Sequence, residues 1–305
     1  MTKLTTKVLR RSKGDKIGKD DTLLVWYEGS LAKSGTRFDG NYDFKTFEVP
    51  YATPTYLQLG GSFVQAPRAV AGPFEFVVGK GTVIPGWEQT FKKGRRLGEV
   101  IDVTIPADLA YKEQGSTNVP PNSDLRFKIE VLGALPKGGK TGDAKFPQLK
   151  HYGVNTSKLG LSSKELEQLN SSKIGLDGKD QLIGDNSKDL LVGLGGNDKL
   201  EGAAGADVLI GGSGKNRFVY TDINDSPAGK GEQDSIYGFS KKDTINLRGL
   251  DGELSYIGAK KFSGAAGDVR FKKGILELDQ DGDGSADFAI ALPGTSALKD
   301  SQLLL

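Results

Sequence analysis

Residues 194–216 read LGGNDKLEGAAGADVLIGGSGKN, and this stretch belongs to a nine-residue repeat that decides the fold of the second half of the chain. Three columns of the repeat keep one period over five units. The first column is glycine, the second is aspartate until its last member, and the third is apolar. Their members are Gly175, Gly184, Gly193, Gly202 and Gly211; Asp180, Asp189, Asp198, Asp207 and Asn216; Leu182, Leu191, Leu200, Leu209 and Phe218. This agreement favours a folded structure over a flexible glycine-rich tract.

Each unit combines a six-residue glycine-rich turn with a three-residue strand such as residues 208–210. Two units form one coil of a flattened spiral, so Asp180 stacks against Asp198 and Asp189 stacks against Asp207. Rows of carboxylates repel one another without a counterion. Calcium binds about six to eight oxygens, which carboxylates and the carbonyls of glycine-rich turns supply. The repeat therefore predicts calcium binding.

The same residues resemble the RTX calcium-binding nonapeptide repeat, GGxGxDxUx. The resemblance implies a parallel β-roll with calcium between successive turns. Weaker ion binding is expected at the two ends of the roll, because several units depart from the pattern. The departures are Leu176, Asp185 and Leu194 at the second glycine, and Asn216 at the last aspartate. The candidate calcium ligands of the repeat are Asp180, Asp189, Asp198, Asp207 and Asn216.

Downstream, DQDGDGSAD at 279–287 fits the start of a DxDxDG calcium loop. Ile290 stands where an EF-hand has glutamate. The flanking runs ILELD and DFAIAL alternate as strands, so an acidic β-hairpin tip is the alternative. The candidate ligands here are Asp279, Asp281, Asp283 and Asp287.

Residues 234–305 resemble the region that follows the repeats in serralysin-type secreted proteins. That resemblance implies an uncleaved C-terminal signal for type I secretion. The catalytic half of serralysins has no counterpart, because His151 is the one histidine of the chain. Protease activity is therefore not expected.

The composition excludes several kinds of chemistry. The 305 residues include no cysteine, which excludes disulfides, thiol nucleophiles and cysteine-ligated metals. A single histidine argues against a histidine-paired triad or a two-histidine zinc site. The net charge is +2, divided as +6 for residues 1–140 and −4 for residues 141–305, which gives little support for binding to nucleic acid. No apolar run approaches the length of a membrane span, and the N-terminus lacks the pattern of a signal peptide.

The first half of the chain has the pattern of an α+β domain. Apolar runs predict strands, at 22–31, 74–78, 99–105 and 125–132. One short helix is expected after Pro85 in IPGWEQTFKKG, because proline suits a first helical turn and Gly94 suits a helix end. Residues 136–173 lose this pattern, except for a short helix predicted at 162–170 from the capping-box spacing of Ser162 and Glu165.

Three ordered blocks in this half resemble the FKBP-type peptidyl-prolyl isomerase family. They are VWYEGSLAKSGTRFDG at 25–40, PFEFVVGKGTVIPGWE at 73–88 and AYKEQGSTNVPPNSDLRFKIEVL at 110–132. The resemblance covers about residues 22–135 and implies a bent antiparallel sheet wrapped on one short helix. On spacing alone, the aromatic residues of these strands would be core. The family's pocket residues correspond to Tyr27, Phe38, Asp39, Phe74, Val83, Ile84, Trp87, Tyr111, Val119 and Phe127.

The resemblance implies catalysis without a nucleophile. Rotation about an X–Pro bond is slow because the planar amide is stabilised by resonance. A dry aromatic site favours the twisted amide, which has less charge separation than the planar one. Trp87 would form the floor under the prolyl ring, with Phe38, Phe74 and Phe127 as walls. The Tyr111 hydroxyl would hold the substrate carbonyl, and Asp39 near Tyr27 would form a polar edge.

Two departures from the family limit this expectation. Lys112 and Thr90 stand where the family usually has glycine. The 34 residues between Asp39 and Phe74 exceed the usual length, and this insertion is rich in aromatic residues. It either adds a flap that binds polypeptide or covers the site.

Together these patterns predict a multidomain protein. Residues 1–136 form the α+β FKBP-like bent antiparallel sheet with one short helix, interrupted by the insertion at 40–72. Residues 137–172 form a linker, 173–220 an all-β parallel β-roll, and 221–305 a C-terminal β region with a candidate secretion signal.

The expected function is peptidyl-prolyl cis–trans isomerisation of proline-containing polypeptides. Calcium is expected as a structural ion, and catalysis is expected to need no cofactor. The expected location is extracellular or at the cell surface, reached through type I secretion machinery without an N-terminal signal peptide, with the cytoplasm as the alternative. The alternative functions are a non-catalytic polypeptide-binding module and a calcium-dependent extracellular structural protein. Neither a nucleic-acid partner nor a transmembrane segment is expected.

Overall fold

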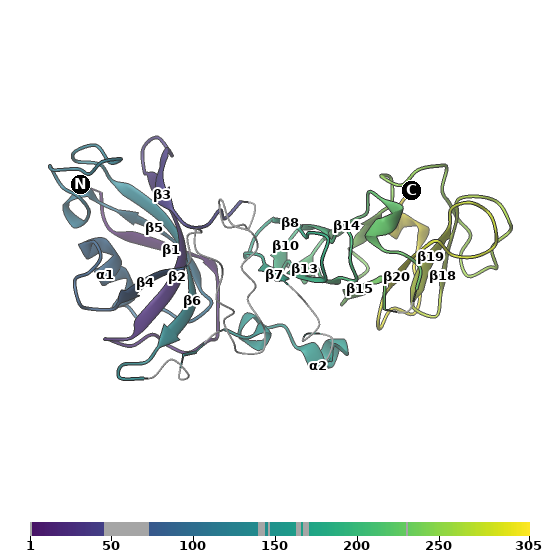
Figure 1. Ribbon diagram of the computed structural model, residues 1–305, viewed down its shortest axis with the longest axis horizontal. Helices are drawn as coiled ribbons and strands as arrows, with labels where there is room; N and C mark the ends of the chain where they lie inside the picture. The colour runs from purple at the N-terminus through teal and green to yellow at the C-terminus, as the bar shows by residue number, and fades with distance from the viewer. Residues whose placement is uncertain are drawn as a thin grey trace. The chain divides into compact units, whose positions relative to one another are not determined.

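The computed structural model describes residues 2–45, 73–139, 144–145, 147–162, 166, 171–229 and 231–305. The chain divides into two compact units, of which the first ends at Val154 and the second runs from Asn155 to Leu305. Each unit has its own sheets, and Figure 1 labels many of their strands. Within the described residues, no helix has both the length and the apolar character needed to cross a membrane.

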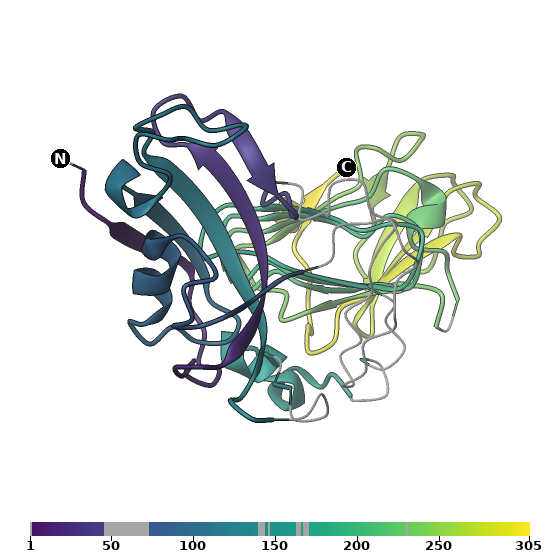
Figure 2. The ribbon, with the colours of Figure 1, turned by 60° about the vertical axis from the view of Figure 1, so that its left-hand side comes forward.

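The N-terminal unit is a six-stranded antiparallel sheet with one short helix, α1 (Pro85–Phe91), packed across it. The sheet order is β1-β5-β6-β2-β3, with β4 beside β2. Figure 2 shows α1 on the concave side of the bent sheet. This arrangement confirms the expected fold class. The strands are β1 (Thr5–Arg10), β2 (Thr22–Leu31), β3 (Arg37–Gly40), β4 (Phe74–Val77), β5 (Val100–Ile105) and β6 (Leu125–Leu135), and a 3-10 turn, η1 (Ala107–Leu109), follows β5.

Helix α1 lies so close to the sheet that its second residue has to be glycine. A Cβ atom on Gly86 would lie 2.3 Å from Cγ2 of Ile105 on β5. Trp87 and Phe91 then point into the core and are buried. Thr90 is also buried, and its hydroxyl donates a hydrogen bond of 2.7 Å to the Gly86 carbonyl, so this departure from the family pattern is accommodated within the helix.

Strand β1 was not predicted, because its sequence TTKVLR is polar and basic. It pairs with β5 alone, and its last residue, Arg10, is 1% exposed. The Arg10 guanidinium forms an ion pair with Glu130 on β6. Its Nε donates a hydrogen bond of 3.1 Å to the Gly98 carbonyl, and its Cζ lies 4.9 Å from the centre of the Tyr152 ring. Burial raises the pKa of Tyr152 to about 12.

The segment that was expected to be a linker is partly folded. Tyr152 belongs to a 3-10 turn, η3 (Leu149–Tyr152), and its ring covers Gly98. The Lys13 amide donates a hydrogen bond of 2.8 Å to the His151 carbonyl. Through these contacts the turn η3 packs as part of the N-terminal unit, with the Tyr152 ring over the buried Arg10. Most of the predicted helix at 162–170 and most of the insertion at 40–72 lie outside the described residues.

The C-terminal unit begins with a short helix, α2 (Thr156–Leu159), and continues as stacked sheets. An eight-stranded sheet contains, in chain order, β7 (Ser171–Ile174), β9 (Asp189–Val192), β12 (Val208–Ile210), β15 (Asp234–Tyr237), β17 (Ser255–Tyr256), β18 (Asp268–Lys272), β19 (Ile275–Asp279) and β20 (Phe288–Ala291). A five-stranded sheet contains β8 (Gln181–Ile183), β11 (Lys199–Glu201), β14 (Arg217–Val219), β16 (Thr244–Asn246) and β21 (Leu303–Leu304), and a third sheet pairs β10 (Gly195–Gly196) with β13 (Ser213–Gly214). Two further 3-10 turns are η4 (Ile223–Asp225) and η5 (Asp300–Gln302).

The registers of this unit confirm that two nine-residue units form one coil. Leu200 on β11 lies opposite Leu182 on β8 and Phe218 on β14. Leu209 on β12 lies opposite Leu191 on β9. These pairs are all parallel and all 18 residues apart. All five side chains have no exposed surface, so the apolar column forms the thin core of the roll.

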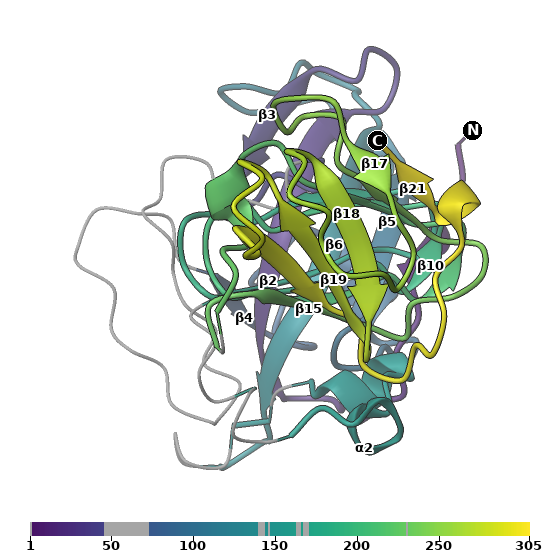
Figure 3. The ribbon, with the colours of Figure 1, turned by 90° about the vertical axis from the view of Figure 1, so that its right-hand side faces the viewer.

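The parallel stacking continues past residue 220, where the repeat was expected to end the roll. Leu209 also faces Ile236 on β15, and Phe218 faces Ile245 on β16. These offsets are 27 residues, because a loop containing η4 is inserted before β15. The unit then closes with the antiparallel strands β18, β19 and β20, which Figure 3 shows together with β15.

The buried Arg10 predicts a large effect on the stability of the N-terminal unit. Glu130→Gln leaves the guanidinium buried without its counter-charge, which costs about 3 kcal/mol in the free energy of unfolding. Urea unfolding followed by tryptophan fluorescence measures this unit alone, because Trp26 and Trp87 both lie in it. Asp102→Asn is the matched control, because its partner Arg126 is half exposed and such pairs contribute less than about 1 kcal/mol. Equal losses for the two variants would contradict the prediction.

Candidate functional site

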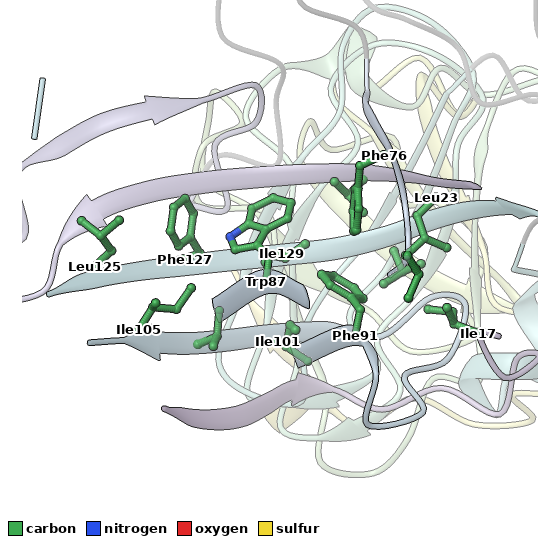
Figure 4. Packing of buried hydrophobic residues seen from close by; sticks show 14 of the residues in the cluster. Ile17, Leu23, Phe76, Trp87, Phe91, Ile101, Ile105, Leu125, Phe127 and Ile129 are labelled. Atoms are coloured by element: carbon green, nitrogen blue, oxygen red, sulfur yellow. The ribbon is translucent and has the colours of Figure 1, made fainter. Parts of the chain in front are cut away.

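The first candidate site is a cluster of aromatic rings centred on Trp87. The indole ring makes edge contacts with Tyr27 at 5.4 Å, Phe127 at 5.3 Å and Phe74 at 5.9 Å between ring centres. Figure 4 shows the indole between Phe127 and Phe76. The Trp87 Nε1 atom is buried and has no hydrogen-bond partner among the described residues. The indole N–H is thus a hydrogen-bond donor without an acceptor at the centre of the cluster.

The outer part of this cluster is accessible and has a polar edge. Phe74 is 37% exposed, which is unusual for a large apolar side chain. The Tyr27 hydroxyl donates a hydrogen bond of 2.9 Å to the exposed carboxylate of Asp39. Partial burial, and then Asp39, raise the pKa values of Tyr27 and Tyr111. Both hydroxyls therefore stay protonated at neutral pH and can donate hydrogen bonds.

The structure brings the predicted residues of this site together. Phe38 packs edge-on against Phe127 at 5.6 Å. Val119 is buried within the same apolar cluster, and the partly buried residues packed on it include Tyr27, Phe38, Val83, Ile84 and Tyr111. Sequence reasoning did not include Phe76 and Phe91, whose rings lie 5.5 and 6.0 Å from Trp87. Phe76 on β4 and Phe91 on α1 are both buried core residues, and their rings pack against Trp87 on the inner side of the cluster.

The second candidate site is the column of aspartates in the roll. The later members of the column use Oδ1 to accept a hydrogen bond from the backbone N–H of the residue one coil earlier. Asp198 accepts from Asp180 at 2.9 Å, and Asp207 accepts from Asp189 at 2.8 Å. Asn216 accepts from Asp198 at 3.1 Å in the same way. The predicted stacking is therefore present, and it is built on backbone hydrogen bonds that the repeat pattern did not reveal.

The second oxygens of these carboxylates differ along the roll. Oδ2 of Asp180 accepts a hydrogen bond from Leu176, and Oδ2 of Asp189 accepts one from Asp185. Oδ2 of Asp198 and Oδ2 of Asp207 are buried and have no hydrogen-bond partner among the described residues. Burial raises the pKa of Asp198 to about 7 and the pKa of Asp207 to about 9. A buried carboxylate oxygen without a donor is the environment that a cation would satisfy.

The third candidate site is the loop between β19 and β20. One carboxylate oxygen from each of Asp279, Asp281 and Asp283 lies within 4.8 Å of the others. Asp287 is not part of this group, and its Oδ2 accepts a hydrogen bond from the Gln280 amide at 2.7 Å. Ile290, at the twelfth position, is a buried strand residue that pairs with Asp234. The loop is thus a hairpin tip that also gathers three carboxylates.

Comparison with known proteins gives each unit a relative. Residues 13–132 match the family model described as FKBP-type peptidyl-prolyl cis-trans isomerase, and residues 170–304 match the one described as Peptidase M10 serralysin C terminal. FK506-binding protein 5 of Dictyostelium discoideum is 33% identical over 126 residues, which is 41% of this chain and 7% of that protein. The isomerase FkpA of Escherichia coli K12 is 30% identical over 135 residues, which is 44% of this chain and 39% of that protein.

These two relatives are much longer than the part that the chain matches. A third, the peptidyl-prolyl cis-trans isomerase FKBP15-2 of Arabidopsis thaliana, is 33% identical over 151 residues, which is 48% of this chain and 69% of that protein. The chain belongs to the FKBP-type peptidyl-prolyl isomerase family. Its C-terminal unit is similar to the serralysin C-terminal region, which suggests calcium binding.

Lys112, one of the two positions at which this FKBP-type unit departs from its family, has the backbone conformation of a glycine. Lys112 has a φ of 53°, in the left-handed region that glycine enters most readily. Its amide donates to the Ala107 carbonyl at 3.1 Å and its carbonyl accepts from Asn122 at 2.7 Å. The residue after Tyr111 therefore has the conformation that glycine would favour, and the two backbone hydrogen bonds hold Lys112 in it.

Because of this strain, Lys112→Gly should raise the free energy of unfolding of the FKBP-type unit by up to about 1 kcal/mol. Lys92, at the end of α1, has a φ of −60°, so Lys92→Gly should instead lower it by about 0.5–1 kcal/mol. Urea unfolding followed by tryptophan fluorescence tests both. Destabilisation by Lys112→Gly would show that the lysine side chain has a role beyond its backbone.

The unpartnered aspartates predict a pH dependence of the C-terminal unit in chelator. The pKa values of Asp198 and Asp207 in the folded unit lie above the ordinary value of 3.8, so the folded unit holds protons that the unfolded chain releases. Its stability is then full below about pH 4 and falls as the pH rises toward about 7 for Asp198 and about 9 for Asp207.

Circular dichroism in chelator at several pH values measures this loss as the fraction of the unit that is folded, which should be highest at low pH. Asp198→Asn keeps the oxygen that accepts from Asp180 and should make the fall between about pH 4 and pH 7 less steep, because the fall due to Asp207 remains. Added calcium should raise the stability of the wild-type unit most at the higher pH values. A wild-type profile in chelator that does not change with pH would rule out unpaired carboxylates.

Proposed function

We propose that the protein is a peptidyl-prolyl cis–trans isomerase that acts on proline-containing polypeptides and carries a calcium-binding roll. The observation that supports catalysis best is the aromatic cluster, in which Trp87 has an unpartnered N–H and Phe74 is exposed. The names of the relatives agree with this activity. The catalytic residues are proposed to be Tyr27, Phe38, Asp39, Phe74, Val83, Ile84, Trp87, Tyr111, Val119 and Phe127.

The proposed mechanism uses the apolar surface to favour the twisted amide. A prolyl ring packed on Trp87 and Phe127 places the X–Pro bond where little water reaches it. The planar amide loses more solvation there than the twisted amide, so the barrier falls. The hydroxyl of Tyr111, protonated at neutral pH, would donate a hydrogen bond to a substrate carbonyl. Asp39 would orient Tyr27 through their hydrogen bond.

The roll is proposed to hold calcium through oxygens that have no other partner. Asp198 and Asp207 fit this role best, because each has a buried Oδ2 without a donor. The group of Asp279, Asp281 and Asp283 would hold a further ion. Asp281 and Asp283 would contribute most to it, because both oxygens of Asp279 accept backbone hydrogen bonds, from Gly282 and Gly284. Asp180, Asp189, Asn216 and Asp287 have side chains committed to backbone hydrogen bonds, so they would support the coils and contribute less to the ion.

Export without an N-terminal signal is the further proposal for the whole chain. The similarity of residues 170–304 to the serralysin C-terminal region supports it. In low calcium, carboxylate repulsion and chain entropy would keep the roll unfolded, and calcium outside the cell would fold it. Circular dichroism that shows equal structure in calcium and in chelator would contradict this coupling, and retention of the protein inside its own cells would contradict export.

The deciding experiment is the cis-to-trans rate of an Xaa–Pro peptide with the full chain, in calcium and in chelator. We expect acceleration under both conditions, because the aromatic cluster lies in a unit with its own core. Tyr111→Phe should lower kcat/KM by about 3- to 10-fold through the loss of one hydrogen bond. Tyr42→Phe is the matched control. The Tyr42 ring stacks on Trp26 at 5.5 Å, and Trp26 faces the side of the sheet opposite to Tyr27, because neighbouring residues of a strand face opposite sides.

Three results are informative. Equal rates for wild type and Tyr111→Phe would remove Tyr111 from the mechanism. Acceleration in calcium alone would mean that the roll supports the catalytic unit. No acceleration under either condition would overturn the isomerase proposal and favour the non-catalytic polypeptide-binding module.

A further inference from the structure

One edge of strand β2 is shared by two strands that do not meet. Strand β4 pairs with β2 up to Val25, and β3 pairs with it from Glu28 onward. Strand β6 pairs along the whole of the opposite edge. Within the described residues, the backbone of Trp26 and Tyr27 therefore lies at a gap between β4 and β3. The insertion at 40–72 connects these two strands, so it leaves the sheet at this gap.

The side chain of Asn41 fills the gap. Its Oδ1 accepts a hydrogen bond of 2.8 Å from the Tyr27 amide, and its Nδ2 donates one of 3.3 Å to the Val25 carbonyl. The Asn41 amide donates a third, of 3.0 Å, to the Tyr27 carbonyl. Asn41 is 5% exposed. Because a side-chain amide is both a donor and an acceptor, Asn41 supplies the backbone of β2 with the partners that a neighbouring strand would supply.

The turn that carries Asn41 also holds the other end of Tyr27. Oδ2 of Asp39 accepts from the Tyr27 hydroxyl at 2.9 Å, and its Oδ1 accepts from the Gly40 amide at 2.8 Å. Gly40 has a φ of 143°, and a Cβ atom there would lie 2.8 Å from the Tyr27 carbonyl oxygen, so the turn requires glycine. Residues 39–41 thus hold Tyr27 at both its backbone and its hydroxyl.

The backbone bonds of Asn41 decide where the Tyr27 side chain lies. The Tyr27 ring makes edge contacts with Trp87 at 5.4 Å and with Phe74 at 5.7 Å, but Phe74 is itself 37% exposed. Without the Asn41 side chain, the Tyr27 amide would lack its acceptor, and the backbone would have to move to find another. A small displacement of a group that positions the substrate lowers the rate of reaction strongly.

We propose that Asn41 is a positioning residue that sets the Tyr27–Asp39 pair at the polar edge of the isomerase site. The proposal rests on the proposed isomerase activity and adds a residue that acts through Tyr27 rather than on the substrate. It also means that the insertion at 40–72 is attached to the catalytic site at its second residue.

The test measures kcat/KM for cis-to-trans isomerisation of an Xaa–Pro peptide by the full chain, in a double-mutant cycle. Asn41→Ala should lower kcat/KM by about 10-fold in the wild type and by less than about 3-fold in Tyr27→Phe, because a residue that acts through the Tyr27 hydroxyl loses most of its effect once that hydroxyl is absent. Equal fold losses in the two backgrounds would overturn the proposal.

The same assay separates this proposal from the proposed function. A wild type that does not accelerate isomerisation would overturn the isomerase activity, and the role of Asn41 with it. An active wild type and an equally active Asn41→Ala variant would overturn the role of Asn41 alone. If Asn41→Ala does not fold, Asn41→Ser replaces it in the cycle, because its hydroxyl can still accept from the Tyr27 amide.

Ser12→Ala is the matched control, because it also removes a buried bond from a side chain to the backbone. Ser12 follows β1 and is 8% exposed, and its hydroxyl accepts from the Gly14 amide at 3.0 Å. This variant should lower the urea midpoint of the FKBP-type unit and leave kcat/KM unchanged. A loss of activity equal to that of Asn41→Ala would show that both variants act through stability, and would contradict positioning.

Nuclear magnetic resonance gives a direct measure of the position of Tyr27. The Tyr27 ring lies beside the Trp87 indole, so the chemical shifts of its ring protons depend on the geometry of this contact. These shifts should change in Asn41→Ala and stay at their wild-type values in Ser12→Ala. Wild-type Tyr27 shifts in an Asn41→Ala variant that has lost activity would overturn the proposal.

Discussion

The C-terminal unit depends on one repeated interaction, the hydrogen bond from a backbone N–H to a buried carboxylate one coil later. It joins Asp180 to Asp198 and Asp189 to Asp207, and it fixes the spacing of the coils as firmly as the short parallel strands do. The cost is that each aspartate that accepts such a bond buries a negative charge. Where the second oxygen of the carboxylate also accepts a hydrogen bond, both of its oxygens have partners. Where it does not, the buried carboxylate needs a proton or a cation.

The N-terminal unit depends on no such charge. Its core is a set of aromatic and aliphatic side chains packed between α1 and the sheet, and its one buried cation, Arg10 among the described residues, has Glu130 as a counter-charge. The same packing that stabilises the unit also forms the aromatic surface around Trp87. Core and candidate site are therefore continuous here, whereas in the roll the core and the acidic positions are separate columns of one repeat.

Features that depend on periodicity could be predicted from the sequence, whereas features that depend on a single contact between distant residues could not. The 18-residue register follows from the nine-residue columns, and the grouping of Trp87 with Tyr27 and Phe127 follows from the family motifs. Strand β1 was missed because the burial of Arg10 depends on Glu130 and Tyr152, which are far away in sequence. Asp234 and Asp243 were missed although each precedes a buried isoleucine by two residues, as the aspartates of the repeat precede their leucines, because the loop before them breaks the nine-residue count.

The difference between the two units determines where calcium can act. The apolar column of the roll supplies one leucine or phenylalanine per nine-residue unit, which buries little apolar area to oppose chain entropy. A ligand that binds only the folded roll, as calcium is proposed to do, would therefore add a large share of its stability. The aromatic core of the FKBP-type unit is apolar among its described residues, so we expect calcium to add little to its stability. Calcium is therefore expected to control whether the second unit is folded, while the chemistry of the first unit is set by packing alone.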